Sequence, residues 1–201
     1  MGETIRRGIH LLALGMWFGG AAFFNFFTAT TIFESFKHVV NDGPTDRTAF
    51  VTIVPAEFTA DTDAAKNTRS NLASALAGSA VGPVFPKYFA MQAVCGLLAL
   101  ATAIGWRDAP GLIHRWRVRV LFVAVLTVVV AWPISNYVSE LRVLRFALET
   151  ATRDAAVAAF GPWHLVSLLL SFVTVTLAGI ALAMGGKLPN CCSEQHKGEK
   201  V

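Results

Sequence analysis

"VLFVAVLTVVVAWPISNYVS" (Val120–Ser139) contains no Asp, Glu, Lys or Arg, and the chain holds three more such runs: Gly8–Phe33, Tyr88–Trp106 and Ala155–Gly186. A helix rises about 1.5 Å per residue, so about 20 apolar residues cross a bilayer core of about 30 Å. Lipid satisfies no backbone N–H or C=O group, so the runs are predicted to be helices rather than isolated strands. Buried core helices of a soluble protein do not account for four such runs in 201 residues that are 54% hydrophobic.

The fold class predicted from these runs is an all-α integral membrane bundle of four transmembrane helices in up-down-up-down order. It forms one domain over residues 1–186, followed by a disordered cytoplasmic tail at 187–201. The first run is longer than a signal-peptide core of about 7–15 residues and lacks a clear cleavage site, so we expect it to be retained. The spans are expected at about 8–28, 86–106, 118–139 and 162–185.

The longest predicted connection is a polar outer loop at residues 34–82, with a short strand at 49–54 and a short helix before Gly82-Pro83. After the third span, leucines recur at helical spacing in "SELRVLRFALETATRDAAVAAF" (139–160). This pattern predicts an amphipathic extension of the third span. Gly161-Pro162 is expected to end that extension, with Pro162 opening the fourth span.

The distribution of basic residues predicts the orientation in the membrane. Nine Lys and Arg residues lie in the short segments 1–7, 107–119 and 187–201, which an even number of spans places on one side; eight lie in the two long connections. The positive-inside rule therefore places both termini in the cytoplasm, and we expect a bacterial inner or plasma membrane. The net charge of +4 then reflects topology, so the expected partner is the lipid bilayer and not nucleic acid.

Polar side chains from spans two, three and four are expected at one membrane level on the non-cytoplasmic side. One interpretation is an interfacial belt, in which lysine snorkels and aromatic residues lie at the head groups. The other is a pocket in which Lys87 pairs with Glu140, while Asn136 and His164 orient an anion, a metal or a polar head group. Charges at membrane depth are costly unless they are paired, which favours a partner for the lysine. The residues of this outer cluster are Lys87, Tyr88, Asn136, Tyr137, Glu140 and His164.

His10 lies one turn into the first span, near its cytoplasmic end. It is predicted to be a hydrogen-bonded structural residue, or a cofactor ligand if a haem is bound. One haem cannot easily use both His10 and His164, because most of the bilayer separates them. Nucleophile, phosphate-loop and zinc signatures are missing from the sequence, so no catalytic residue and no metal ligand is predicted.

The predicted spans also carry stripes of small residues, which mark the sides where membrane helices pack closely. The stripe on the first span consists of Gly8, Gly15, Gly19 and Ala22. Packing within one bundle accounts for these stripes. They also suit contacts with a second copy of the chain or with a larger membrane complex.

Four blocks of the sequence resemble, in chain order, those of the transmembrane protein 205-like family of small four-span membrane proteins. The FP-x-YF motif and the histidine that opens the fourth span are the more specific parts. The resemblance covers most of the chain and implies a four-helix membrane fold, but no established biochemical activity. The 37–70 loop and the Cys191-Cys192 tail depart from the family pattern. The blocks are "HLLALGMWFGG" (10–20), "VFPKYFAMQAVCGLLAL" (84–100), "SNYVSELR" (135–142) and "WHLVSLLLSFVT" (163–174).

Three functions follow as hypotheses. The first is a non-enzymatic binding, accessory or transport-related bundle that uses the outer cluster. The second is a haem- or porphyrin-handling oxidoreductase similar to the membrane protoporphyrinogen oxidases, whose pattern has a first-helix histidine and a lysine at one porphyrin site. His10 supplies the histidine, but Lys87 is predicted on the opposite side of the membrane. The third is a structural subunit of a larger membrane complex.

Overall fold

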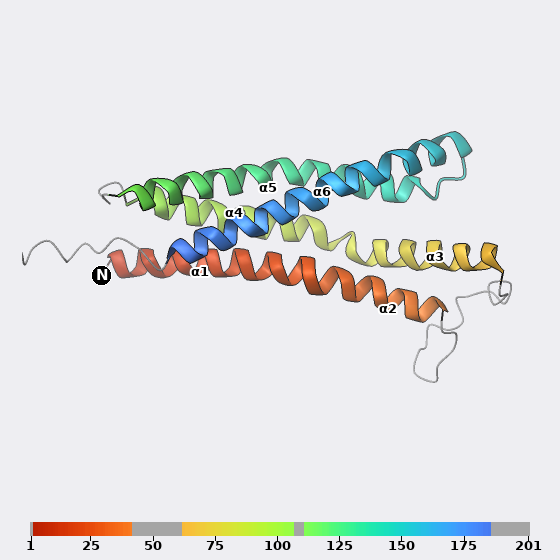
Figure 1. The fold of residues 1–201 in the computed structure, drawn as a ribbon, viewed down its shortest axis with the longest axis horizontal. Helices are drawn as coiled ribbons and strands as arrows, with labels where there is room; N and C mark the ends of the chain where they lie inside the picture. The colour runs from red at the N-terminus through yellow and green to blue at the C-terminus, as the bar shows by residue number, and fades with distance from the viewer. Residues whose placement is uncertain (1, 42–61, 107–110, 186–201) are drawn as a thin grey trace, which may run out of the picture. The chain divides into compact units, whose positions relative to one another are not determined.

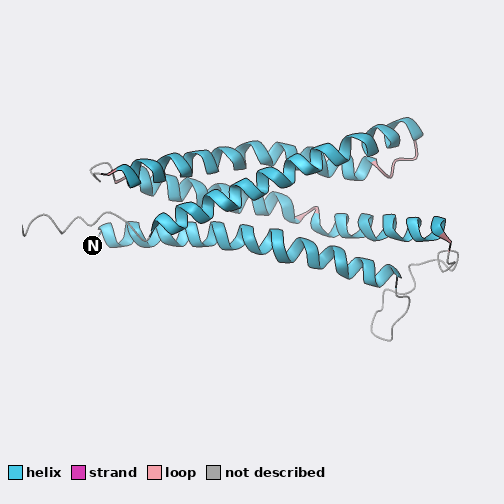
Figure 2. Ribbon diagram, in the orientation of Figure 1, coloured by secondary structure: helices cyan, strands magenta, loops and turns pink. Residues whose placement is uncertain are grey.

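The computed structural model describes residues 2–41, 62–106 and 111–185 of the chain. The described residues form helices and no strand (Figure 2). Along the chain (Figure 1) the elements are α1 (Gly2–Phe23), the π-helix η1 (Phe24–Thr28), α2 (Ala29–Asn41), α3 (Asp63–Val81), α4 (Val84–Ile104), α5 (Leu112–Leu144) and α6 (Thr150–Met184).

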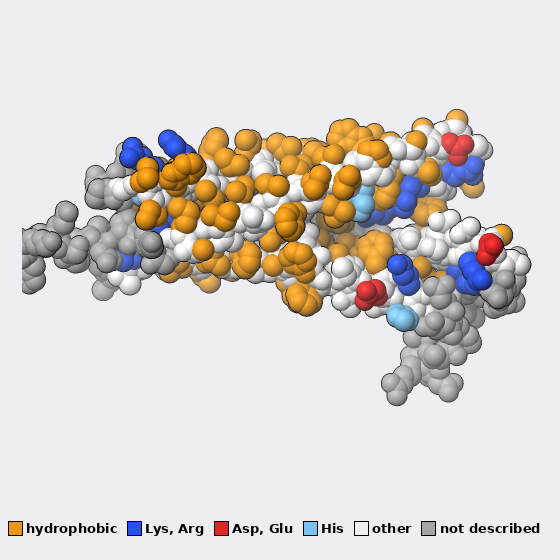
Figure 3. All heavy atoms as spheres, in the orientation of Figure 1, with side chains coloured by type: hydrophobic (Ala, Val, Ile, Leu, Met, Phe, Trp, Pro, Cys, Tyr) orange, Lys and Arg blue, Asp and Glu red, His pale blue; other side chains and the backbone are white. Residues whose placement is uncertain are grey.

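Four helical stretches are long and apolar enough to cross a membrane: Gly2–Val40, which runs through α1, η1 and α2, then Val84–Ile104, Leu112–Leu144 and Thr150–Met184. On the face shown in Figure 3, hydrophobic side chains cover long stretches of the surface, and charged side chains lie in separate groups. Large apolar side chains such as Phe122 and Phe172 are exposed, as lipid-facing residues are. The prediction of an all-α fold with four spans is confirmed.

The predicted polar loop at 34–82 is largely helical in its described part. The first span continues as α2 to Asn41, and α3 packs against α2 (Figure 1). Thr62 caps the N-terminus of α3, because its side chain accepts a hydrogen bond from the Ala65 backbone N–H at 3.3 Å. The helix before Gly82-Pro83 is therefore longer than the sequence indicated. The predicted strand at 49–54 and the tail at 187–201 lie outside the described residues.

The break after the third span lies earlier than predicted. Helix α5 extends past Ser139 to Leu144, but α6 begins at Thr150 and continues through Gly161-Pro162. The Glu149 carbonyl accepts from the Arg153 backbone N–H at 3.0 Å, and its carboxylate accepts from the Thr152 hydroxyl at 2.6 Å. Both hydrogen bonds join Glu149 to the first turn of α6, and they stabilise the start of this helix at Thr150. Proline inside a membrane helix is tolerated because neighbouring groups satisfy the freed backbone, and α5 likewise contains Pro133.

Contacts within the chain divide it into two compact units. Unit 1 comprises residues 1–21, 90–131 and 169–201, and unit 2 comprises residues 22–89 and 132–168. The core of unit 1 is built on Trp17, which is fully buried and donates from Nε1 to Gln92 Oε1 at 3.3 Å. A hydrogen bond of 2.9 Å between the Thr127 and Thr174 hydroxyls joins α5 to α6 in the same unit.

The packed side of α1 differs from the predicted one. A Cβ atom at Gly8, Gly15 or Gly19 would meet nothing within 4 Å among the described residues. The buried residues of α1 are His10, Ala13, Leu14, Trp17 and Ala21. The glycine stripe of α1 is therefore not part of the packing within the described chain.

Candidate functional site

An aromatic cluster in unit 2 joins the π-helix η1 to the start of α4. The Phe24 ring stacks on the Tyr88 ring with centroids 4.3 Å apart, and it meets the Phe85 ring edge-on at 5.5 Å. The adjacent Asn25 donates from Nδ2 to the Tyr88 hydroxyl at 2.8 Å. The π-helical turn thus presents two consecutive side chains to one tyrosine, and π-turns inside helices are often found at functional sites.

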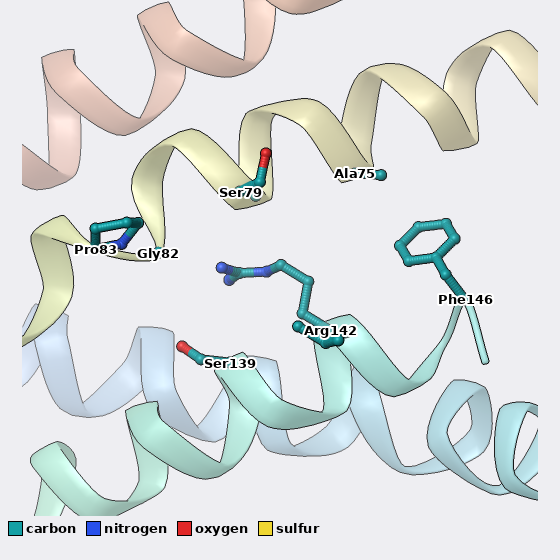
Figure 4. Close-up of a pocket in the computed structure, with 9 residues that line it drawn as sticks. Ala75, Ser79, Gly82, Pro83, Ser139, Arg142 and Phe146 are labelled. Carbon is teal, nitrogen blue, oxygen red and sulfur yellow. The ribbon is translucent and has the colours of Figure 1, made fainter.

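Arg142 extends from α5 toward α3 and the Gly82-Pro83 turn (Figure 4). Its guanidinium lies over the Phe85 ring, 5.7 Å from the centroid. A Cβ atom at Gly78 would lie 2.5 Å from Arg142 Cδ. Because Gly78 has no side chain, the arginine can pass this close to α3. The aromatic cluster and α3 together hold the arginine in its extended position.

A cavity of about 540 Å³ lies beside Arg142 in unit 2 (Figure 4). Its polar groups are the guanidinium and the hydroxyls of Ser79 and Ser139, and the rest of the lining is mostly apolar. Ser79 Oγ donates to the Leu76 carbonyl at 2.8 Å, so its oxygen can still accept. The lining residues are Ala75, Gly78, Ser79, Gly82, Pro83, Ser139, Arg142, Val143 and Phe146.

Positive charge accumulates around this cavity. Arg145 lies over the Phe160 ring at 3.9 Å from the centroid, and Phe160 stacks on His164 at 5.1 Å. The charges of Arg142 and Arg145 repel each other, and both act on His164. Burial lowers the pKa of Arg145, which lies between α5 and α6. Among the described residues, no carboxylate makes a hydrogen bond or an ion pair with Arg142.

The structure brings only some of the predicted outer cluster into contact with neighbours. Tyr88 is buried against Phe24 and Asn25, Tyr137 meets the Trp163 ring edge-on at 5.4 Å, and His164 stacks on Phe160. The remaining members are exposed and make no hydrogen bond or ion pair with any described residue, so the suggested pairing of Lys87 with Glu140 is not formed. These residues are Lys87, Asn136 and Glu140.

Sequence reasoning missed Arg142, which it treated as part of an amphipathic helix. A signal was nevertheless present in the sequence. Arg145 and Arg153 each have Glu149 four residues away, whereas no acidic residue lies three or four positions from Arg142 on either side. An arginine without a local partner at the end of a span indicates a partner elsewhere in the fold or in a ligand.

Unit 1 contains a second polar group of residues, built around the fully buried His10. His10 Nδ1 lies 2.8 Å from Thr102 Oγ1 and 3.1 Å from the Ala99 carbonyl oxygen. The carbonyl can only accept, so Nδ1 carries the proton, and the Nε2 lone pair accepts no hydrogen bond from any residue that the structure describes. Trp106 meets the imidazole edge-on at 4.9 Å, and Arg6 lies over the Trp106 ring at 5.3 Å.

No group of three or more His, Cys, Asp or Glu side chains in the described ranges is arranged to hold a metal ion. In one respect His10 is suited to be the ligand of a cofactor. Its Nδ1–H donates to the Ala99 carbonyl, and its Nε2 makes no hydrogen bond with any described residue. The Trp106 ring beside it limits the room for a planar macrocycle.

Four apolar helices of spanning length define a multi-pass integral membrane protein, and the lipid bilayer is its environment. Residues 64–134 match a family model described as a domain of unknown function, DUF4149. The match covers most of α3, all of α4 and the first part of α5, and it ends before Arg142. No curated protein and no solved structure matches the chain. The similarity fits an uncharacterised family, while the resemblance to the transmembrane protein 205-like family stays a prediction.

Proposed function

We propose that this protein is a non-enzymatic membrane protein that binds an anionic group in the cavity beside Arg142. The observation that carries the proposal is a part-buried guanidinium that lines a cavity and makes no hydrogen bond or ion pair with any described residue. A charge withdrawn from water is costly unless it is paired. The planar fork of a guanidinium suits carboxylate and phosphate oxygens, which it binds through two parallel hydrogen bonds.

The surroundings of the cavity support an anion rather than a cation. Arg145 adds positive charge near the cavity, and the Ser139 and Ser79 hydroxyls line it. The proposal retains His164 from the predicted outer cluster and replaces Lys87 by Arg142 as the charge that faces the ligand. The basic residues at 1–7 and 107–119 favour cytoplasmic termini, which would place this cavity on the non-cytoplasmic side.

Arg142→Gln is expected to weaken binding of an oxyanion by about tenfold or more, because hydrogen bonds to a charged group contribute about 1.5–3 kcal/mol. The measurement is a ligand-observed NMR titration of the purified protein in neutral detergent with acetate, inorganic phosphate and dodecanoate. Arg153→Gln is the matched control. It removes an arginine of unit 2 that is exposed and lies beside Asp154 instead of lining the cavity. Equal binding to wild type and Arg142→Gln across all three anions, or binding of none of them, would contradict the proposal.

The haem- or porphyrin-handling hypothesis has one observation in its favour, the free Nε2 of His10. If haem were bound, His10 would hold it through Nε2, and the haem would supply redox chemistry. The expected result for this alternative is a Soret band on the gently purified protein that is lost in His10→Ala and kept in His164→Ala. A protein without visible absorption, before and after incubation with haem, would remove the alternative.

The proposal includes a contact with a second copy of the chain or with another membrane protein. The open glycine face of α1 at Gly8, Gly15 and Gly19 supports it, because small residues let membrane helices approach closely. Co-purification with a stoichiometric partner would identify the complex.

A further inference from the structure

We infer that the ligand of the Arg142 cavity is a monoanionic amphiphile, that is, one oxyanion head joined to an apolar chain. This inference rests on the proposed function and adds the chemical class of the ligand. Two sources share this chemistry, a long-chain carboxylate and the phosphodiester head of a membrane lipid.

The charge of the head group follows from the cations at the site. Arg142 alone contributes a guanidinium to the cavity lining, while the Arg145 guanidinium lies against the face of Phe160, 3.9 Å from the ring centroid. One cation in the cavity balances one negative charge. Arginine offers two parallel N–H groups, which match two oxygens of a carboxylate or of a phosphodiester.

The apolar part of the ligand follows from the walls and the volume. Beyond the guanidinium and two serine hydroxyls, the lining consists of residues such as Ala75, Pro83, Val143 and Phe146. A small hydrated anion would leave these walls in contact with water, whereas a hydrocarbon chain would cover them. Cavities of about 300–1,000 Å³ hold ligands of drug size, and the volume here is about 540 Å³.

The rim of the cavity shows where the chain would leave. Val143 and Phe146 line the cavity and are 72% and 46% exposed. Exposed apolar side chains that adjoin one another mark surfaces where an apolar group can bind. An amphiphile can therefore place its head on Arg142 and its chain over these side chains without burying a polar group.

The test uses a photoreactive probe, a twelve-carbon carboxylate with a diazirine on its chain, added to the full-length protein in neutral phosphatidylcholine nanodiscs. We expect crosslinks within residues 75–85 and 139–146, mapped by mass spectrometry. Labelling should fall at least tenfold in Arg142→Gln and should be unchanged in Arg153→Gln. Dodecanoate, phosphatidylglycerol or both should compete, and which of them does so identifies the source of the head group.

Two results would overturn the inference while the proposed function stands. The first is that acetate or inorganic phosphate competes as well as dodecanoate at equal concentration. The second is that the same probe with an alcohol head labels these segments equally. Labelling that is independent of Arg142 would instead overturn the proposed function itself. The competition arms need only the wild-type protein, so they decide the inference even if Arg142→Gln does not fold.

Discussion

Gly96→Ala is expected to lower the free energy of unfolding by about 1–3 kcal/mol, the usual cost of overpacking a core. The added Cβ atom would lie 2.8 Å from Trp17 Cη2 and 3.1 Å from Val125 Cγ2. The Trp17 indole cannot move aside easily, because it is fully buried and its Nε1 donates to Gln92. The substitution must therefore displace the helices of unit 1 around the indole.

Gly20→Ala is the matched control for this prediction. Its Cβ atom would lie 2.7 Å from Met91 Cε, the mobile end of a flexible side chain, so the methionine can turn away. We expect a change within about 0.5 kcal/mol for the control. Cys95 adjoins Gly96 and is buried, so its rate of thiol labelling reports unfolding when Cys191 and Cys192 are replaced by serine. Equal labelling rates in the two variants would contradict the packing argument.

Arg117→Gln is expected to lower the free energy of unfolding by about 2–3 kcal/mol, because it removes a charged hydrogen-bond donor from the core. Arg117 is fully buried and donates from Nη2 to the Met184 carbonyl at 2.6 Å. Met184 is the last residue of α6, where backbone carbonyls lack partners within the helix and carry the negative end of the helix dipole. The arginine thus caps α6 from α5, and the shorter glutamine cannot reach that carbonyl in the same way.

Arg119→Gln provides the comparison for Arg117. It removes the same charge from the same segment, so any effect on membrane orientation is matched. Arg119 is exposed and lies over the Trp116 ring at 5.5 Å, an interaction of about 0.5–1 kcal/mol at exposed sites. Thermal unfolding in detergent should therefore show a clearly larger drop in Tm for Arg117→Gln. Similar drops for both variants would indicate that Arg117 does not cap α6.

The candidate site was predictable only in part. Tyr88 and His164 were recognised because polar and aromatic groups at the ends of apolar runs are visible in a sequence. Both belong to groups of stacked side chains near the Arg142 cavity. Tyr88 stacks on Phe24, whose ring also meets Phe85. His164 stacks on Phe160, which lies under the Arg145 guanidinium. Lys87 and Glu140 were proposed as a pair, but proximity in membrane depth does not set the direction of a side chain.

The sequence by itself determined the membrane class and the four spanning helices. Crossing a bilayer needs only a long enough run without charges, and that property is local to each segment. Only the tertiary structure decided that α3 begins at Asp63 and packs on α2, and that Gly78 lets Arg142 reach the cavity. These features depend on contacts between residues far apart in the chain, and no local pattern of charge or hydropathy encodes them.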